Sequence, residues 1–121
     1  MTYDNNNIFA KILREEIPCK KIYEDNFVLS FYDINPQKKI HALVIPKGKY
    51  INLDDFSNNA SDKEIVGLIK GINIVAKKIG ISSEIGKGYR ALANVSENGG
   101  QEVPHLHFHL FGGEKVGRMV Q

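Results

Sequence analysis

The sequence predicts an α+β domain in which a five-stranded, mainly antiparallel sheet packs against one short and one long helix. Three observations predict it: five short strand-like segments, one long segment with helical periodicity, and turn-forming connections between neighbouring strands. Tight turns join antiparallel strands, whereas parallel strands need long crossovers. A chain of 121 residues without internal repeats fits one such domain.

Composition excludes several classes of protein. Hydrophobic residues make up 42% of the chain, which is enough for a packed core. The formal charge of +2 is too small to predict binding to nucleic acid or to a membrane surface. The single cysteine, Cys19, rules out an internal disulfide, and no apolar run approaches the roughly 20 residues of a membrane helix. Because the start of the chain does not resemble a signal peptide, we expect a cytoplasmic protein.

The N-terminal half predicts an arm, a short helix and three strands. Residues 1–7 are polar and are expected to form a flexible arm, so that the domain spans 8–121. Apolar residues then recur at helical spacing, and Pro18 would end this helix by Ile17 or earlier. A tight turn at Asp25-Asn26 separates the first two strands. The three strands are predicted at 21–24, 27–33 and 40–45.

One long helix is the clearest element of the C-terminal half. Ser61 and Glu64 fit a capping box, and Gly80 is placed to end the helix in a left-handed conformation. Gly67 and Gly71 each cost about 1 kcal/mol relative to alanine inside a helix. They are either tolerated weaknesses or a surface that another backbone approaches closely, as in a homodimer. The predicted apolar stripe comprises Ile65, Leu68, Ile69, Ile72, Val75, Ala76 and Ile79. The remaining strands are predicted at 89–95 and 106–111, joined by a turn at 96–100.

Three histidines alternate with apolar residues in the last predicted strand. Successive side chains of a strand point to opposite faces, so His105, His107 and His109 project from one face. Burial of the intervening side chains contributes roughly 1.5–3 kcal/mol each and would fix this register. The intervening residues are Leu106, Phe108 and Leu110. Two chemistries remain open, namely metal ligation by the three imidazoles and nucleophilic catalysis by one of them.

A glycine-containing loop precedes the histidines. Gly99 and Gly100 allow backbone N–H groups to turn toward an anion, as in phosphate-binding loops. Beside three histidines, this loop suits a phosphoryl oxyanion better than a bare cation. Glu102 is near enough to leave a hydrolytic metal site open.

The segment from Gly99 to His109 resembles the signature of the histidine triad (HIT) family, His-x-His-x-His with apolar x. The whole chain most resembles the branch of histidine triad nucleotide-binding proteins (HINT), because further blocks follow in the same order. These blocks cover 8–12, 16–18, 31–36, 41–47 and the chain from 89 onward.

The resemblance implies a HIT-like fold in which two copies dimerise into a continuous sheet. It also implies hydrolysis of purine nucleoside 5′-phosphoramidates, of the adenosine 5′-monophosphoramidase type, to a nucleoside monophosphate and an amine. No metal or other cofactor is implied for this reaction.

By this resemblance His107 is the nucleophile and forms a nucleotidyl-histidine intermediate that water hydrolyses. The attacking nitrogen must be unprotonated, and the main-chain carbonyl of His105 would accept the hydrogen bond of the other ring nitrogen. His109 would contact the phosphate and help to protonate the departing amine, since a P–N bond breaks easily only once its nitrogen is protonated. His41 and His105 would belong to the supporting hydrogen-bond network.

The resemblance also implies the substrate contacts. Asn94 and the backbone of Gly100 and Val103 would hold the phosphate. Asp33 would accept hydrogen bonds from the ribose hydroxyls, with turn capping as the alternative. Where some members have a serine, this chain has Glu102, of which only the backbone N–H is a plausible contact. The base would lie in an apolar slot of Ile8, Phe9, Ile12, Ile17, Phe31 and Ile34, which without the resemblance are simply core.

Three alternative functions remain. A dinucleoside polyphosphate hydrolase or nucleotidyl transferase would belong to the same superfamily, although Phe108 stands where a proline would suggest the transferases. A nucleotide-binding regulatory or scaffold protein would act through a dimer surface. A metal site formed by His105, His107 and His109 is the last. The chain has no tryptophan, so 117–121 would close the leaving-group side differently from relatives that use one near the C-terminus.

Overall fold

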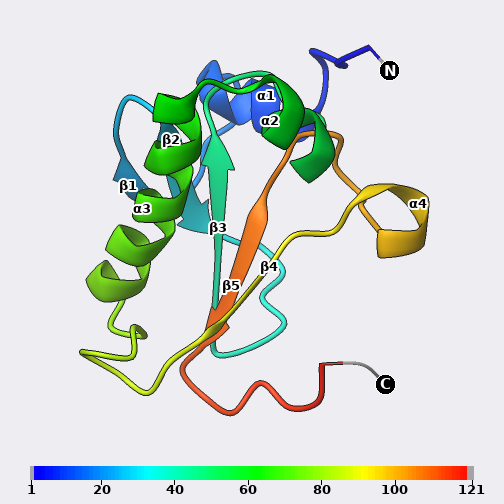
Figure 1. The fold of residues 1–121 in the computed structure, drawn as a ribbon. Helices are drawn as coiled ribbons and strands as arrows, with labels where there is room; N and C mark the ends of the chain where they lie inside the picture. The colour runs from blue at the N-terminus through cyan, green and yellow to red at the C-terminus, as the bar shows by residue number, and fades with distance from the viewer. Residues whose placement is uncertain (1, 120–121) are drawn as a thin grey trace.

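Five antiparallel strands form one sheet with helices on both faces in the computed structural model, which describes residues 2–119 (Figure 1). The strands are β1 (Lys21–Glu24), β2 (Val28–Tyr32), β3 (Ile40–Pro46), β4 (Arg90–Leu92) and β5 (Phe108–Gly112). The helices are α1 (Ile8–Leu13), α2 (Leu53–Asn59), α3 (Asp62–Lys78) and α4 (Ser96–Gly99). The strand order is β1-β2-β3-β5-β4, so β1 and β4 are the edges. No helix within residues 2–119 is both long and apolar enough to cross a membrane.

The predicted sheet and the two predicted helices are confirmed, with differences at their ends. The turn after β1 forms as expected, because Oδ1 of Asp25 accepts the backbone N–H groups of Phe27 and Val28. The predicted strand 89–95 is shorter, and the last strand begins two residues later than predicted, at Phe108. The predicted turn at 96–100 contains α4.

Helix α2 was not predicted. It begins after Asn52, whose side chain accepts the N–H of Asp55, and its buried contact with the core is Phe56. Seven residues with one buried apolar side chain show too little periodicity to be recognised in the sequence.

Helix α3 begins and ends where the sequence predicts. Ser61 and Glu64 form the capping box, and Gly80 adopts φ +77° immediately after the helix. The predicted apolar stripe is wrong at Ile69, which is 59% exposed. The buried face of α3 is narrower than predicted and consists of Leu68, Gly71, Ile72, Val75 and Ala76.

The two glycines of α3 make room for the chain's own hairpin. A Cβ at Gly67 would lie 2.6 Å from the ring of Phe27, and a Cβ at Gly71 would lie 3.0 Å from Val28. Gly67 is therefore needed for packing and is not a tolerated weakness, and the hairpin side chains Phe27 and Val28 are the groups that approach the two glycines. A homodimer contact on this surface stays a prediction.

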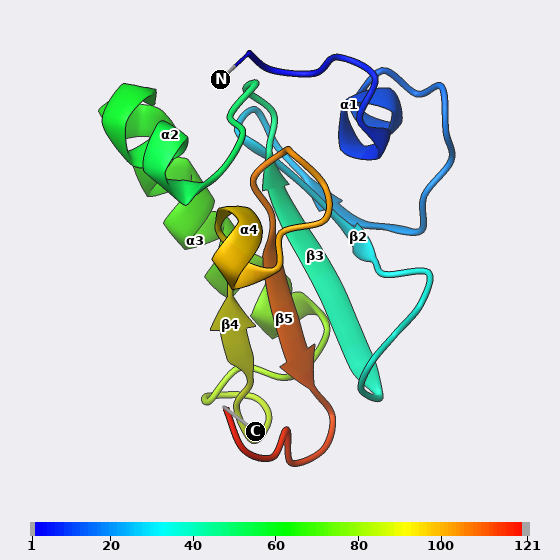
Figure 2. The same ribbon diagram turned by 90° about the vertical axis from the view of Figure 1, so that its right-hand side faces the viewer.

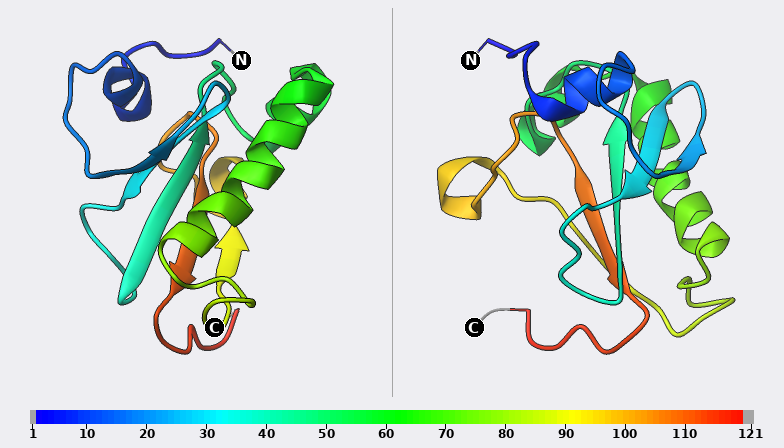
Figure 3. Two further views of the ribbon diagram at one scale, coloured as in Figure 1. Left: turned by 90° about the vertical axis from the view of Figure 1, so that its left-hand side faces the viewer. Right: turned by 180° about the vertical axis from the view of Figure 1, so that it is seen from behind.

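Helices α1 and α3 lie on opposite faces of the sheet (Figures 2 and 3), and each face buries its own core. Under α3 lie alternate residues of the strands, among them Val28, Val44 and Leu110. Under α1 on the opposite face lie Leu29 and Leu43, together with other members of a smaller cluster. As predicted, Leu106, Phe108 and Leu110 point to the α3 face, so the histidines that alternate with them point to the other.

The segment predicted as a loose arm packs specifically on the domain. The side chain of Asn7 is buried and caps α1 by accepting the N–H of Ala10. The N–H of Asn7 donates to the carbonyl of Asp4, and the guanidinium of Arg14 donates to the carbonyl of Asn5. This local hydrogen bonding orders residues 4–7 because polar side chains satisfy the free backbone groups at the helix start.

Candidate active site

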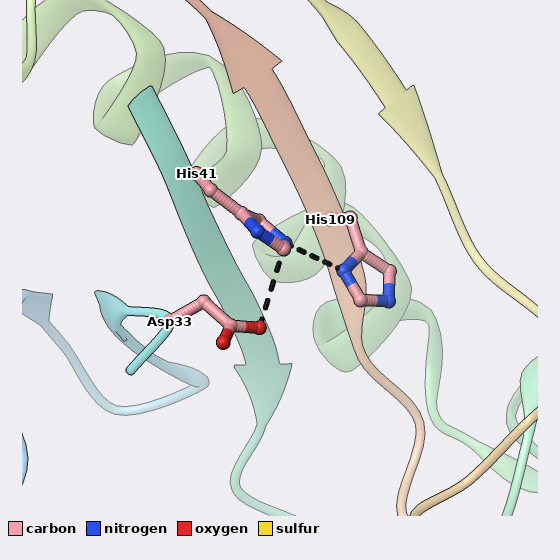
Figure 4. A group of neighbouring side chains, drawn as sticks. All are labelled: Asp33, His41 and His109. Atoms are coloured by element: carbon pink, nitrogen blue, oxygen red, sulfur yellow. Dashed lines mark hydrogen bonds and ion pairs between the residues drawn. The ribbon is translucent and has the colours of Figure 1, made fainter. Parts of the chain in front are cut away.

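Histidines from two adjacent strands meet on the face of the sheet opposite α3. The register of β3 and β5 pairs Leu43 with His109 and His41 with Phe111, which makes the two histidines diagonal neighbours. Nε2 of His41 lies 2.9 Å from Nδ1 of His109, and Oδ2 of Asp33 lies 3.5 Å from the same His41 nitrogen (Figure 4). The sheet thus joins side chains that are 68 positions apart in the chain.

The hydrogen bonds of His41 determine which nitrogens of this pair carry protons. The backbone N–H of Gln37 donates to Nδ1 of His41 at 3.1 Å, so the proton of the neutral His41 ring is on Nε2. This Nε2–H then donates to Nδ1 of His109. The proton of the neutral His109 ring is therefore on Nε2, the nitrogen that points away from His41 in Figure 4.

His107 has the opposite tautomer. Its Nδ1 lies 2.8 Å from the carbonyl of His105, which can only accept, so Nδ1 carries the proton and Nε2 keeps a free lone pair. His105 is completely buried, donates from Nε2 to the Pro46 carbonyl at 2.8 Å and accepts at Nδ1 from the Tyr3 hydroxyl at 2.6 Å. The ring of Phe9 packs edge-on against both histidines, with centroid distances of 4.9 Å to His107 and 6.3 Å to His105.

Burial lowers the pKa of all four imidazoles. It lowers the pKa of His105 to about 4, and it lowers the pKa of His109 to about 4 with the help of the neighbouring His107 and His41. Burial also lowers the pKa of His107 and of His41, against the opposing effect of the Asp33 carboxylate. At neutral pH the four rings are therefore uncharged, which is the state that a nucleophilic nitrogen requires.

Three of the histidines open onto a cavity of about 490 Å³. It is lined by His41, His107 and His109 together with Phe9, Asp33, Asn35, Gln37, Leu43, Leu92, Asn94, Gly100, Glu102, Val103 and Phe111. A larger hollow of about 790 Å³ lies between 80–90 and 113–116 and contains none of the histidines. The smaller cavity is therefore the candidate active site.

Comparison with protein families matches residues 14–116 to the HIT domain. The chain belongs to the HIT domain family. An uncharacterised 13.2 kDa HIT-like protein of Azospirillum brasilense is 52% identical over 119 residues, which are 98% of this chain and 95% of that protein. An uncharacterised HIT-like protein of Helicobacter pylori is 49% identical and covers 90% of this chain and 98% of its own.

Solved HIT structures have the same fold. A HIT family hydrolase from Clostridium thermocellum superposes with a TM-score of 0.84 at 36% identity, covering 98% of this chain and 99% of that one. A histidine triad protein from Clostridium difficile superposes with a TM-score of 0.81 at 39% identity, covering 97% and 98%. The HIT-like fold predicted from the sequence is thus confirmed.

The HIT fold brings most of the predicted site residues together. Those that line the cavity are His41, His107, His109, Phe9, Asp33, Asn94, Gly100, Glu102 and Val103. His105 lies behind them, where its carbonyl faces Nδ1 of His107. The chemical role of each of these residues remains a prediction.

The predicted apolar slot for a base does not form one continuous surface. Phe9 lines the cavity, whereas Ile8 is 41% exposed and Ile34 is 84% exposed, and neither lines it. The core under α1 contains Ile12 and Phe31, with Ile17 packed against it. Phe31 is covered by Phe9, whose ring packs edge-on against it at 5.6 Å between centroids, and the chain after β2 carries Ile34 into solvent.

In the loop that the sequence predicts to hold a phosphate, Gly100 lines the cavity but its N–H is hydrogen-bonded. This residue ends α4 with φ +74°, and its N–H already donates to the carbonyl of Glu97 at 3.0 Å. It therefore has no free N–H for a phosphate. Within residues 2–119 the N–H groups of Glu102 and Val103 have no acceptor, which leaves these two as the backbone donors of the loop.

Asp33 caps a turn, which was the alternative to ribose binding, and it also lines the cavity. Its Oδ1 accepts the N–H of Asn35 at 2.8 Å and so caps the turn that follows β2. Its Oδ2 points toward His41, as Figure 4 shows. One carboxylate oxygen is thus used by the turn, and the other remains at the site.

Sequence reasoning missed four groups that contact the histidines, one of which is the Tyr3 hydroxyl. Gln37 and Pro46 act through their backbone N–H and carbonyl, which no side-chain pattern reveals. The ring of Phe111 stacks on His109 with an interplanar angle of 3° and packs against His41 at 4.3 Å between centroids. Phe111 could have been found, because the period of two that aligns the triad continues through it.

The donor chemistry disfavours a metal ion at these histidines. Ligand atoms of Asp33, His41 and His109 lie within 4.8 Å of one another. A histidine that binds a metal through Nε2 normally donates its Nδ1–H to an acceptor, but Nδ1 of His41 faces the N–H of Gln37. The predicted set of His105, His107 and His109 also fails as a ligand set, because both nitrogens of His105 are already hydrogen-bonded inside the core.

Proposed function

We propose that this HIT protein hydrolyses purine nucleoside 5′-phosphoramidates through a nucleotidyl-histidine intermediate on His107. The observation that carries the proposal is the hydrogen bond from Nδ1–H of His107 to the carbonyl of His105. It leaves the lone pair of Nε2 unprotonated on a ring that lines the cavity. The hydrolase name of related HIT structures supports hydrolysis, and the resemblance of the chain to the HINT branch supports the choice of a phosphoramidate.

In the proposed first step, Nε2 of His107 attacks the α-phosphorus and the bond from phosphorus to the leaving nitrogen breaks. His109, which the bound phosphate brings to its charged state, gives the proton on Nε2 to the departing amine, and in the second step the attacking water returns a proton to His109. In the second step water attacks the phosphorus, the bond to His107 breaks, and the nucleoside monophosphate leaves. The ring of His107 is thereby returned to its starting tautomer.

The charges around the cavity favour neutral N–H groups as the phosphate donors and His109 as the acid. Its described lining contains the carboxylates Asp33 and Glu102 but no lysine or arginine, so neutral donors would hold the phosphate. The free N–H groups of Glu102 and Val103 and the Nε2–H of His109 are suitable donors. A bound anion raises the pKa of neighbouring imidazoles, which would move His109 toward the charged state that an acid needs.

We also propose that the active form is a homodimer with a continuous sheet. Strand β4 pairs with β5 on one side and lies at the edge of the five-stranded sheet. A second copy that pairs with this edge would satisfy its free backbone groups. Sedimentation equilibrium tests this arrangement, and a monomer at micromolar concentration would contradict it.

Mass spectrometry of protein quenched during turnover tests the reaction. With adenosine 5′-phosphoramidate as substrate, we expect a peptide that carries one nucleotidyl group on His107. Diadenosine polyphosphate serves as the comparison substrate, and faster turnover of it would favour the polyphosphate hydrolase instead. Turnover of the phosphoramidate by metal-free protein without any adduct would overturn the covalent mechanism.

A further inference from the structure

We propose that Tyr3 is a positioning residue for the nucleophile and acts on His107 through His105. The inference rests on the proposed function, because it assigns a role within the same site. Tyr3 lies before α1, whereas the triad lies at the other end of the chain. The two segments meet in the hydrogen bond from the Tyr3 hydroxyl to Nδ1 of His105, which spans 102 positions of sequence at 2.6 Å.

The direction of this hydrogen bond is determined by the other partner of His105. Nε2 of His105 must donate, because the Pro46 carbonyl that it contacts at 2.8 Å can only accept. Nδ1 is then an acceptor, and the Tyr3 hydroxyl is the group that donates to it. Burial raises the pKa of Tyr3, so the hydroxyl keeps its proton throughout the neutral range.

His105 transmits this constraint to the nucleophile through its own backbone. The carbonyl of His105 accepts the Nδ1–H of His107 at 2.8 Å, and this bond aims Nε2 of His107. Hydrogen bonds at both nitrogens restrict rotation of the His105 ring, and they tie this residue to Tyr3 and to Pro46. Tyr3 therefore completes a chain of hydrogen bonds from the N-terminal segment to the attacking nitrogen.

The N-terminal segment has several contacts besides the Tyr3 hydroxyl. Asn7 caps α1 and bonds to the carbonyl of Asp4, and Arg14 donates to the carbonyl of Asn5. These contacts order the segment independently of His105. Loss of the hydroxyl alone would therefore remove the hold on His105 while the segment stays packed.

The experiment compares Tyr3→Phe with Tyr23→Phe in the full-length protein, at a temperature at which circular dichroism shows both to be folded. Tyr23→Phe is the matched control, since its hydroxyl donates a 2.8 Å hydrogen bond to Asp25 in the β1–β2 turn, away from the site. We expect Tyr3→Phe to lower kcat about tenfold, by slowing intermediate formation, and to change KM less than about twofold. Tyr23→Phe is expected to leave both constants unchanged. Tyr3→4-aminophenylalanine, which restores a donor at the same place, is expected to recover most of kcat.

A second measurement uses the free protein and needs no substrate. Nitrogen-15 NMR of the imidazoles is expected to show Nδ1 of His105 as a hydrogen-bonded acceptor in the wild type. In Tyr3→Phe this signal should shift, and His107 should lose part of its single Nδ1–H tautomer.

Wild-type kcat and an unchanged His107 tautomer in Tyr3→Phe would together overturn the positioning role, even if the variant melts at a lower temperature. Failure of the proposed function looks different. The wild type would then not turn over phosphoramidates, while the NMR comparison would still decide whether Tyr3 orients His105 and His107.

Discussion

The two faces of the sheet are built from the same strands but depend on different properties of their side chains. On the α3 face, Val28, Val44 and Leu110 are fully buried and contribute through volume and apolar area. On the opposite face, His41 and His109 contribute through the direction of individual N–H bonds. The first face accepts apolar side chains of similar volume at small cost, whereas the second depends on which nitrogen carries a proton.

Strand β5 shows how the two faces are connected. Leu110 is buried against α3 and pins the register, and His109 next to it is thereby held on the other face. Packing therefore places the imidazoles. The tautomer of His41 is then set by the N–H that Gln37 donates to it, and that of His107 by the His105 carbonyl, which accepts its Nδ1–H. The comparison predicts that changes on one face affect stability and that changes on the other affect chemistry.

The largest expected effect is that of His107→Ala, which removes the proposed nucleophile. Turnover of adenosine 5′-phosphoramidate should fall about 10³-fold or more, because no other free imidazole lone pair faces the cavity. Binding of a nucleoside monophosphate, measured by calorimetry, should persist. Full activity of this variant would end the covalent proposal.

Leu110→Ala tests the apolar face of the same strand. The free energy of unfolding in urea should fall by about 2–5 kcal/mol, because the substitution leaves a cavity under α3. At a temperature at which the variant remains folded, its kcat should stay within about twofold of the wild type. A large loss of kcat in the folded variant would show that the two faces are not separable.

Acid should lower the free energy of unfolding through the buried histidines, His105 in particular. The unfolded chain binds a proton on each histidine near pH 6.5, whereas burial holds the pKa of His105 at about 4. The free energy of unfolding is therefore largest above pH 6.5 and decreases as the pH falls toward 4. The decrease due to His105 is about 3 kcal/mol. Urea unfolding at pH 7 and pH 4.5 measures this loss. His105→Gln, which cannot titrate, should show a shallower dependence, and an equal slope in both proteins would refute the assignment.

Gly67→Ala separates helix propensity from packing on the α3 face. Propensity alone predicts a gain of about 1 kcal/mol, but the added Cβ would lie 2.6 Å from Phe27. We expect a net loss of about 1–3 kcal/mol in the free energy of unfolding. In the background of Phe27→Ala the same substitution should be neutral or stabilising, and a loss there as well would point to another cause.

Glu102→Gln gives the smallest expected effect and concerns the charge near the nucleophile. Burial lowers the pKa of His107, and the Glu102 carboxylate partly opposes this shift. Removing the charge should therefore lower the pKa of His107 further and move the acid limb of the pH–rate profile to lower pH. The amide keeps the backbone N–H, so KM should change little, whereas a shift of the limb to higher pH would contradict the electrostatic argument.

Much of the fold could be read from local patterns. The capping box at Ser61, the ending at Gly80 and the turn at Asp25 each depend on residues within a few positions, and the structure confirms them. The alternation of the triad likewise predicts which face its side chains share. Helix α2 escaped prediction because its single buried anchor, Phe56, makes no periodic pattern.

The candidate site likewise has features that local sequence patterns predict and features that depend on the tertiary structure. The sequence by itself determined that the three imidazoles lie on the side of the chain opposite Leu106, Phe108 and Leu110, because side-chain alternation is a local property of extended backbone. Of the three, only His109 lies within β5. Only the tertiary structure decided the protonation of His105 and His109, since their partners come from far along the chain: Pro46 and Tyr3 for His105, and His41 for His109. The partners of His41 and His107 are near in sequence, namely the N–H of Gln37 and the carbonyl of His105, but both are backbone groups. Hydrogen bonds from backbone groups carry no side-chain signature, and they become visible only when the strands are paired.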